Sequence, residues 1–440
     1  MERRRGGLFR HRNFRLLWIG ETISTAGGFL ANVLIPLLAV TVLHANTFDV
    51  AALTAVSWLP WLVIGLPAGA WVDRWPQRPL MITCDLVSAL LFASLPVAAW
   101  LGVLAFWQLM TVALLAGVAE VFFMVAYQVY LPSIIPADDL MEGNAKLQGS
   151  ASASLIGGRS AAGVLAQAMG AAAALVLNAA SFLVSAVCLL LIGPARENRR
   201  EARETRRVPG EAPRGAAGGT TADPGRTTVL AEVTAGVRLV ARDPYLRPLT
   251  LFALAGNLLY SGYSSLAVLF LARVVGVSPA AVGVLTAVGG VGGIAGALVT
   301  KRLCARLGSA RVFILVSVSN VGGLLIPLTR TGYGVTWYVA GAIVLNAGIL
   351  AGNIIAGSFR QGYCPPEMLG RVVAGMRFLA FSAIPVGALL AGALGTALGV
   401  RDALWVFLAL YTLSGAPLWT RSIRTVRDLP PRKLALAESA

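Results

Sequence analysis

The sequence predicts an all-α membrane protein with about twelve spanning helices in two bundles of six. Three observations support this prediction. Of the 440 residues, 57% are hydrophobic and only 13% are charged, whereas soluble globular proteins carry about 25% charged residues. Apolar runs of about twenty residues or more recur along nearly the whole chain, and helices of that length cross about 30 Å of hydrocarbon. A polar insert divides these runs into two sets of six.

Each predicted span is an apolar run that ends at charged residues, glycine or proline. The first bundle covers residues 14–194, with spans at 14–43, 48–72, 79–102, 105–130, 145–169 and 171–193. The second covers residues 246–421, with spans at 248–272, 279–300, 310–329, 335–359, 372–398 and 402–420. A basic arm at 1–13 precedes the bundles, and a tail at 422–440 follows them.

The segment 195–245 is expected to be a linker between the bundles. Residues 195–225 are rich in Arg, Glu, Pro and Gly, so they cannot bury enough apolar surface to fold. Apolar residues then recur at helical spacing, which predicts a short amphipathic helix on the membrane surface. These residues are Val229, Leu230, Val233, Val237 and Val240.

The basic residues predict the orientation of the chain. If the N-terminus is cytoplasmic, every second connection is cytoplasmic too, and the outer loops hold only Arg273, Arg330 and Arg401. By the positive-inside rule, we expect both termini in the cytoplasm and the protein in the inner membrane. The net charge of +16 then reflects topology. Nucleic acid is not expected as a partner, because the basic residues do not alternate with aromatic residues along a groove.

The sequence contains no pattern typical of an enzyme or a metal site. The two histidines are His11, in the basic arm, and His44, in an outer loop. The four cysteines are widely separated, without a CxxC pattern. No GxxxxGK[ST] motif is present, which argues against ATP hydrolysis by a P-loop. We therefore expect no enzymatic activity, cofactor or metal.

Two short patterns occur once in each half of the chain. Two glycines four residues apart precede a polar pair four residues later, and a proline, a leucine and an alanine recur at fixed spacing. The first pattern is Gly65, Gly69, Asp73 and Arg74 against Gly292, Gly296, Thr300 and Lys301; the second is Pro136, Leu140 and Ala145 against Pro365, Leu369 and Ala374. Their equivalent positions predict duplicated halves, as in transporters built from parallel repeats.

The loop GAWVDRWPQR between the second and third spans suggests a conformational latch. Gly65 and Gly69 have the spacing that lets another helix backbone approach closely. Asp73 follows at a helix end, where it can accept hydrogen bonds from the free amides of a neighbouring helix start. Arg74 and Arg78 offer partners to carboxylates across the cytoplasmic rim. We expect one conformation to make these contacts and another to break them.

These features resemble those of the major facilitator superfamily. The six-plus-six helices and basic linker are similar to that family, and GAWVDRWPQRP resembles its signature loop, with Pro76 in place of the usual glycine and Pro79 in place of a basic residue. YLPSIIPADDLMEGNA, RDPYLRP and FRQGYCPPEMLGRVVA resemble its drug and siderophore exporters, which include macrolide-efflux and enterobactin-exporter proteins. The resemblance implies two pseudo-symmetric six-helix bundles that work by alternating access.

The resemblance also suggests roles for individual residues. It implies that Asp73 faces residues 370–373 at the start of the eleventh helix and favours the outward-open state. GGRSAAG, residues 157–163, is similar to the glycine-proline motif of family antiporters, with Arg159 in the place of proline. Asp85 resembles an acidic position near the cytoplasmic rim, which we interpret as part of a structural network with the latch.

Ionisable residues inside the predicted spans are candidates for the substrate or proton pathway, because such residues are costly in lipid and usually face a cavity or a partner. They are Glu21, Glu120 and Arg159. Glu120 and Arg159 are expected at depths that differ by about 6 Å, so one hypothesis is an ion pair that breaks on protonation. The alternative is a fixed structural pair. Further candidates are Tyr127, Asn32, Tyr260 and Tyr263, for which ordinary helix packing is the alternative.

These features predict a secondary transporter that exports an amphipathic small molecule, such as an antibiotic, another secondary metabolite or a siderophore, in exchange for protons. Its expected partners are the small-molecule substrate, protons and the lipid bilayer, and we expect a monomer. One alternative is an importer or uniporter for a nutrient or lipid, since the fold does not fix direction. Another is a membrane sensor or scaffold that transports nothing.

Overall fold

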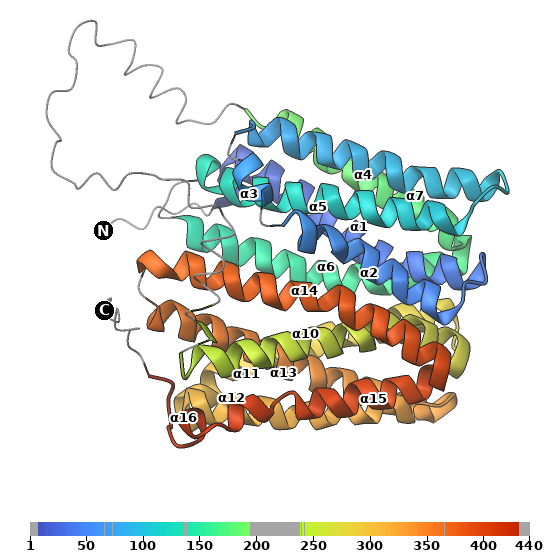
Figure 1. The fold of residues 1–440 in the computed structure, drawn as a ribbon. Coiled ribbons are helices and arrows are strands. Elements are labelled where there is room, and N and C mark those ends of the chain that lie inside the picture. The colour runs from blue at the N-terminus through green and yellow to red at the C-terminus, as the bar shows by residue number, and fades with distance from the viewer. Residues whose placement is uncertain are drawn as a thin grey trace, which may run out of the picture.

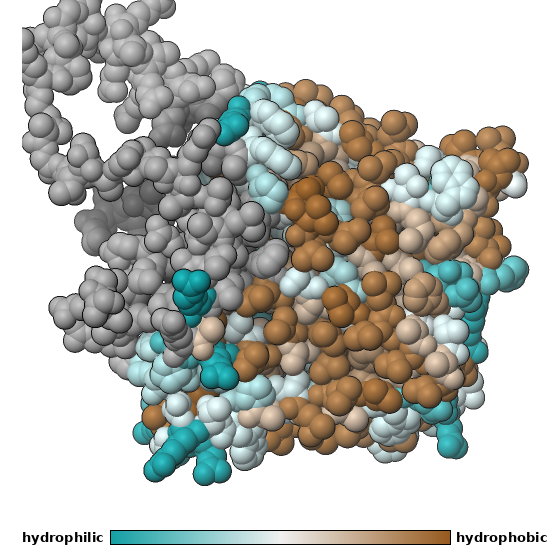
Figure 2. Space-filling model, in the orientation of Figure 1, coloured by the Kyte–Doolittle hydropathy of each residue, from teal (hydrophilic) through white to brown (hydrophobic). Residues whose placement is uncertain are grey.

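The computed structural model describes residues 8–430, apart from residues 66, 73, 136–138, 194–237, 239, 242 and 365. Nine helices in these ranges are long and apolar enough to span a membrane. Figure 2 shows a broad apolar belt between two ends that carry polar residues. The protein is therefore a multi-pass membrane protein, as predicted.

Seven helices form the N half. They are α1 (Arg12–Thr41), α2 (Thr47–Val63), α3 (Pro67–Val72), α4 (Gln77–Trp100), α5 (Phe106–Ile134), α6 (Leu140–Met169) and α7 (Ala171–Leu191). A short 3-10 turn, Leu8–Arg10, precedes α1. Together α2 and α3 form the second predicted span, which is interrupted between Val63 and Pro67. The N half thus supplies six membrane crossings.

The C half supplies the other six crossings. Its helices are α10 (Leu246–Leu269), α11 (Pro279–Leu307), α12 (Ser309–Ser319), α13 (Val335–Tyr363), α14 (Pro366–Leu398), α15 (Val400–Leu413) and the short α16 (Arg421–Arg424). The π-helical η3 (Phe270–Val275) extends α10, and the 3-10 helix η4 (Asn320–Leu328) extends α12. The 3-10 turns η5 (Gly332–Gly334) and η6 (Ala416–Trp419) complete this half. The predicted surface helix near 229–240 lies almost wholly outside the described residues.

The helices run nearly side by side, with the N half above the C half in Figure 1. We call the end where α1 begins and α16 ends the basic end, because basic residues gather there, and the opposite end the far end. Arg12, Arg15, Arg78, Lys301 and Arg421 lie at helix termini of the basic end. At the far end, Asn46 and Asp49 form a reciprocal capping box that fixes the start of α2.

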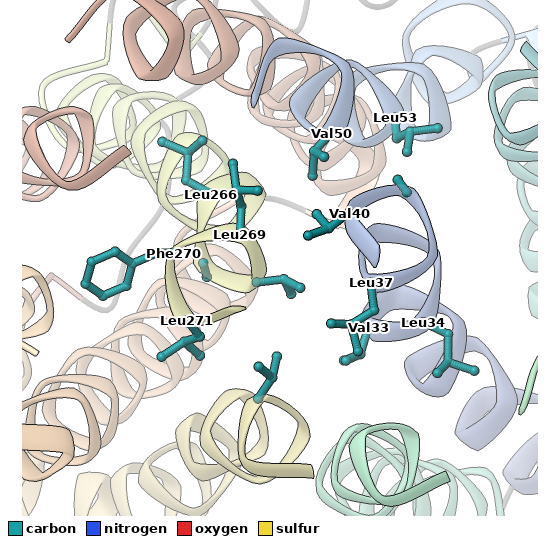
Figure 3. Close-up of a cluster of buried hydrophobic side chains, with 14 of the residues drawn as sticks. Val33, Leu34, Leu37, Val40, Val50, Leu53, Leu266, Leu269, Phe270 and Leu271 are labelled. Atoms are coloured by element: carbon teal, nitrogen blue, oxygen red, sulfur yellow. The ribbon is translucent and has the colours of Figure 1, made fainter. Parts of the chain in front are cut away.

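Buried apolar side chains join the two halves at the far end. One cluster contains Leu37 and Val40 of α1 together with Leu266 and Leu269 of α10, and Figure 3 shows Val40 facing Leu269. We call this cluster the shared core. Glycine lets α6 and α11 approach there, since a Cβ on Gly163 would lie 2.8 Å from the Gly283 Cα and would also collide with the Pro279 carbonyl.

At the basic end, the described residues form two separate cores, one in each half. The N-half core includes Phe14, Met81, Tyr130, Leu147 and Leu189. The C-half core includes Leu246, Phe313, Ile355, Tyr363 and Val372. The halves are thus packed together at the far end and have cores of their own at the basic end.

Candidate functional site

A polar cavity lies between the two halves, midway along the helices. The N half contributes Asn32 and Val33 of α1 and Arg159 of α6. The C half contributes residues of α10, α11 and α13, which are Tyr260, Tyr263, Ser264, Ala267, Val268, Thr286, Gly289, Tyr338, Ala342 and Asn346. The cavity offers about 70 Å³ to the centres of water molecules, and one water needs about 10–15 Å³ on that measure. It therefore has room for several waters or a small polar group.

The C-half wall of this cavity is a network of tyrosines and one amide. The hydroxyls of Tyr263 and Tyr338 lie 3.3 Å apart, and the Tyr260 hydroxyl donates to Asn346 Oδ1 at 3.4 Å. The Asn346 amide nitrogen donates to the Ala342 carbonyl at 2.9 Å. The rings of Tyr260 and Tyr263 meet edge to face at 5.6 Å. These contacts hold the hydroxyls in fixed positions beside the cavity.

Arg159 extends from the N half to this wall. Its Nη1 donates to the Thr286 carbonyl of α11 at 3.2 Å, and its guanidinium lies 5.9 Å from the centre of the Phe29 ring. Ion pairs join Lys146 to Glu142 and Arg427 to Asp428, and Arg159 forms none with the described residues. The hypothetical pair between Arg159 and Glu120 is therefore not formed in this conformation, because the two side chains face different surroundings.

Glu120 instead belongs to an acidic group inside the N half. This group consists of Glu120 of α5, Glu21 of α1 and Asp85 of α4. The carboxylates of Glu120 and Asp85 both lie close enough to that of Glu21 to interact with it electrostatically. The Tyr127 hydroxyl is also within electrostatic range of Glu21. The Glu120 side chain is exposed, although many protein atoms surround its carboxylate. The structure thus gathers four of the predicted residues.

Two oxygens of this acidic group are buried without a hydrogen-bond partner, Glu21 Oε2 and Asp85 Oδ2. The other Glu21 oxygen accepts from the Thr25 hydroxyl at 3.4 Å. Burial of an unpartnered carboxylate oxygen is costly. Glu21 and Asn32 are eleven positions apart on α1, a rise of about 16 Å, so Glu21 lies nearer the basic end than Asn32 of the cavity does.

The latch predicted at the basic end is only partly described. Asp73 lies outside the described residues, and Arg74 is exposed. Arg78 does not reach across the rim; its Nε and Nη2 each donate at 2.8 Å, to the Leu189 and Leu190 carbonyls at the end of α7. It therefore caps a helix within its own half.

The expected close helix approach at Gly65 and Gly69 is wrong for this conformation. A Cβ on Gly69 would meet nothing within 4 Å, and the three atoms nearest to one on Gly65 belong to Trp61 of its own segment. The reason is local, since the helix is interrupted between Val63 and Pro67. The corresponding Gly292 and Gly296 pack closely against the backbone of α13 at Ile343 and Ala347.

Sequence reasoning missed several cavity residues. Tyr338, Ala342 and Asn346 are spaced four residues apart, so they share one face of α13. An asparagine and a tyrosine on the same face of an apolar helix were a usable signal. Thr286 could not have been found in this way, because it binds Arg159 through its backbone carbonyl.

Two six-crossing halves with a polar cavity between them define a class of protein, the multi-pass membrane transporters. The chain belongs to the Major Facilitator Superfamily, whose sequence pattern it matches over residues 17–384. Members of this family bind and move small molecules and are typically monomeric. The chain is accordingly a transporter rather than an enzyme.

Comparison with known proteins supports this assignment. The chain is 27% identical to the multidrug efflux pump Tap of Mycolicibacterium fortuitum over 384 residues, which cover 83% of this chain and 85% of Tap. It is 25% identical to an uncharacterized MFS-type transporter of Sinorhizobium fredii, over 86% of this chain and 85% of that one.

Two solved structures show the same fold. One is a bacterial homologue of the iron transporter ferroportin in its inward-facing state, with a TM-score of 0.70, 17% identity and coverage of 94% of this chain and 98% of that one. The other is the nucleoside transporter NupG, with a TM-score of 0.68, 12% identity and coverage of 92% and 98%.

Proposed function

We propose that this protein exports an amphipathic small molecule in exchange for protons. The observation that carries the proposal is the acidic group of Glu21, Asp85 and Glu120, because carboxylates within a membrane typically serve a proton or substrate pathway. The likeness to a multidrug efflux pump over most of the chain supports the direction of transport. The mechanism is alternating access, in which the two halves rock about the cavity between them.

The positive-inside rule supports a cytoplasmic basic end, and with it a bacterial inner membrane and cytoplasmic termini. In this orientation the far end, which the shared core closes, faces the outside. The basic end, where each half has a core of its own, faces the cytoplasm. The two bundles are residues 14–194 and 246–421, joined by the cytoplasmic linker 195–245. The arm 1–13 and the tail 422–440 also lie in the cytoplasm.

The different environments of the carboxylates support proton coupling. In this proposal Glu120, whose side chain is exposed, exchanges protons with water, whereas Glu21 Oε2 and Asp85 Oδ2 are enclosed. A proton that arrives at Glu21 removes the cost of burying its charge. It also ends the repulsion between Glu21 and its acidic neighbours, so protonation changes how tightly α1, α4 and α5 pack.

Aromatic residues of both halves provide apolar surface for the substrate. The Phe381 ring of α14 lies 5.8 Å from the Trp58 ring and 5.7 Å from the Trp61 ring of α2, measured between ring centres. All three side chains are partly exposed. Such a surface suits the apolar part of an amphipathic molecule, and in this proposal the polar cavity binds its other part.

Transport into everted membrane vesicles tests the proposal. Vesicles from a host without its own efflux pumps should accumulate a substrate when their lumen is acidic, and a protonophore should abolish the accumulation. Glu120→Gln should reduce proton-driven accumulation at least about tenfold, in line with the loss of an essential proton-transfer group. Glu142→Gln is the matched control, because Glu142 is exposed at the start of α6.

Unchanged proton-driven transport in Glu120→Gln would contradict the coupling. The screen should include antibiotics, other secondary metabolites and siderophores. Accumulation in whole cells that express the protein would instead favour a nutrient or lipid importer. No movement of any tested compound in either direction would favour a sensor or scaffold.

A further inference from the structure

The cavity between the halves contains a cation without an anionic partner. Arg159 lies in the middle of the membrane-spanning region, is partly buried, and forms no ion pair among the described residues. Charged side chains at this depth normally pair with an opposite charge or with backbone carbonyls. The Thr286 carbonyl accepts one hydrogen bond from Arg159, but a carbonyl dipole does not neutralise a full charge.

The cavity also offers more hydrogen-bond donors than acceptors. A guanidinium has five N–H groups, of which the structure uses one on Thr286. In the pair of Tyr263 and Tyr338 hydroxyls, one donates to the other, so one proton is left to donate. The Asn346 oxygen already accepts from Tyr260. A ligand that fits this wall must therefore supply acceptor oxygens.

The charge of the cavity determines the sign of the ligand. No acidic side chain is among the described residues that line it, and Arg159 gives it a charge of +1. The Glu21 carboxylate belongs to a residue about 16 Å along α1 from Asn32 of the cavity wall, and Glu120 forms no ion pair with Arg159. An amine would be repelled from the cavity, whereas an anion would be attracted.

We propose that the cavity binds the carboxylate group of the transported molecule. A carboxylate matches the planar fork of a guanidinium and accepts two parallel hydrogen bonds. It is also small enough for a cavity of about 70 Å³, while the apolar part of the molecule extends toward Phe381 and the tryptophans of α2. This inference rests on the proposed export function and narrows its substrates to amphipathic carboxylic acids.

The carboxylate site also contributes to coupling between the halves. Arg159 belongs to the N half, and the tyrosines that face it belong to the C half. A carboxylate that accepts hydrogen bonds from both neutralises the cation and joins the two walls. It therefore stabilises the conformation in which these walls are close, as expected of a transported substrate.

A matched pair of ligands tests the site directly. The purified full-length protein in detergent is heated with increasing 4-phenylbutanoate or its amide, 4-phenylbutanamide, and each Kd is obtained from the rise in Tm with ligand concentration. We expect the carboxylate to bind at least about tenfold more tightly than the amide. Equal affinity for the two compounds would overturn the inference. This comparison needs no variant protein.

Variants then locate the site. Arg159→Gln should abolish the preference for the carboxylate, and Arg159→Lys should retain part of it, because lysine keeps the charge but lacks the planar fork. Tyr338→Phe should weaken carboxylate binding by a smaller factor. Arg302→Gln is the matched control, since Arg302 is exposed on α11 at the basic end, and it should keep the full preference. A preference that persists in Arg159→Gln would also overturn the inference.

The two proposals fail in different ways. A protein that moves neutral or cationic compounds through Glu120, yet ignores carboxylates, contradicts the carboxylate site alone. A protein that binds 4-phenylbutanoate through Arg159, yet moves no compound across vesicle membranes, contradicts the export function alone.

Discussion

The far end and the basic end of this transporter are built differently, although both consist of the same twelve crossings. At the far end, Leu37 and Val40 of one half share a core with Leu266 and Leu269 of the other. At the basic end, each half has a core of its own. This difference shows which contacts a conformational change must break. Opening the far end disrupts the shared core, whereas the two separate cores can move as rigid units.

Of the substitutions proposed here, truncation of a side chain in the shared core should have the largest effect on opening of the far end. Leu269 is fully buried between the halves, and Leu249 is about equally buried within the C-half core. Each Leu→Ala change removes packing worth about 2–5 kcal/mol in soluble protein cores. We expect Leu269→Ala to favour opening of the far end, measured as faster alkylation of a cysteine at Asn32 by an impermeant reagent from that side. Leu249→Ala should lower Tm instead.

If Leu249→Ala speeds alkylation as much as Leu269→Ala does, the distinction between the shared and separate cores is contradicted.

A bulkier residue at the glycine contact should also force the far end apart. Gly163→Val places atoms against Gly283 and the Pro279 carbonyl, at a cost of about 1–3 kcal/mol for overpacking. That range corresponds to roughly a 5- to 150-fold shift between conformations. Gly157→Val on the same helix is the control, because a Cβ there meets nothing within 4 Å. The same alkylation assay should separate the two variants, and equal rates would argue against a close α6–α11 contact.

Loss of a helix cap at the basic end should lower stability without opening the molecule. Arg78→Gln removes two hydrogen bonds of 2.8 Å to the end of α7. Hydrogen bonds to charged groups contribute about 1.5–3 kcal/mol, and partial exposure of Arg78 places the loss at the lower end of that range. Thermal unfolding should show a lower Tm with unchanged alkylation at the far end. Altered alkylation would instead indicate that Arg78 is part of a latch between the halves.

The smallest effect is expected for Arg273→Gln. Arg273 is exposed, and its Nη2 donates to the Val40 carbonyl across the boundary at 3.2 Å. Loss of one exposed hydrogen bond should shift the conformational equilibrium by less than about 1 kcal/mol. Double electron–electron resonance would show at most a slight broadening of far-end distances. A large opening would mean that polar contacts, rather than the shared core, close this end.

The spans were predictable from the sequence because length and apolarity alone decide whether a helix crosses lipid. The twelve runs became helices with ends shifted by up to seven residues, apart from the interruption before Pro67. The spacing rule also succeeded for Gly292 and Gly296, which pack against α13. It failed for Gly65 and Gly69, because spacing describes one helix surface and says nothing about which helix lies opposite.

The candidate site was harder to predict for a similar reason. Helix rise places Glu120 and Arg159 at similar depths, but depth does not specify the direction in which a side chain points. In the structure Glu120 joins Glu21 inside the N half, whereas Arg159 faces the tyrosines of the C half. Tyr338 and Asn346 became recognisable as site residues only when α13 was placed beside α10 and α11.

Distances at the two ends, measured in one experiment, test alternating access most directly. Spin labels at Gln148 and Lys301 report on α6 and α11 at the basic end, and labels at Met169 and Val274 report on the far end. All four positions are exposed, and the native cysteines are replaced by serine. When acid pH shifts the conformation in lipid nanodiscs, the basic-end distance should shorten while the far-end distance lengthens. Distances that change in the same direction at both ends, or do not change at all, would contradict the account.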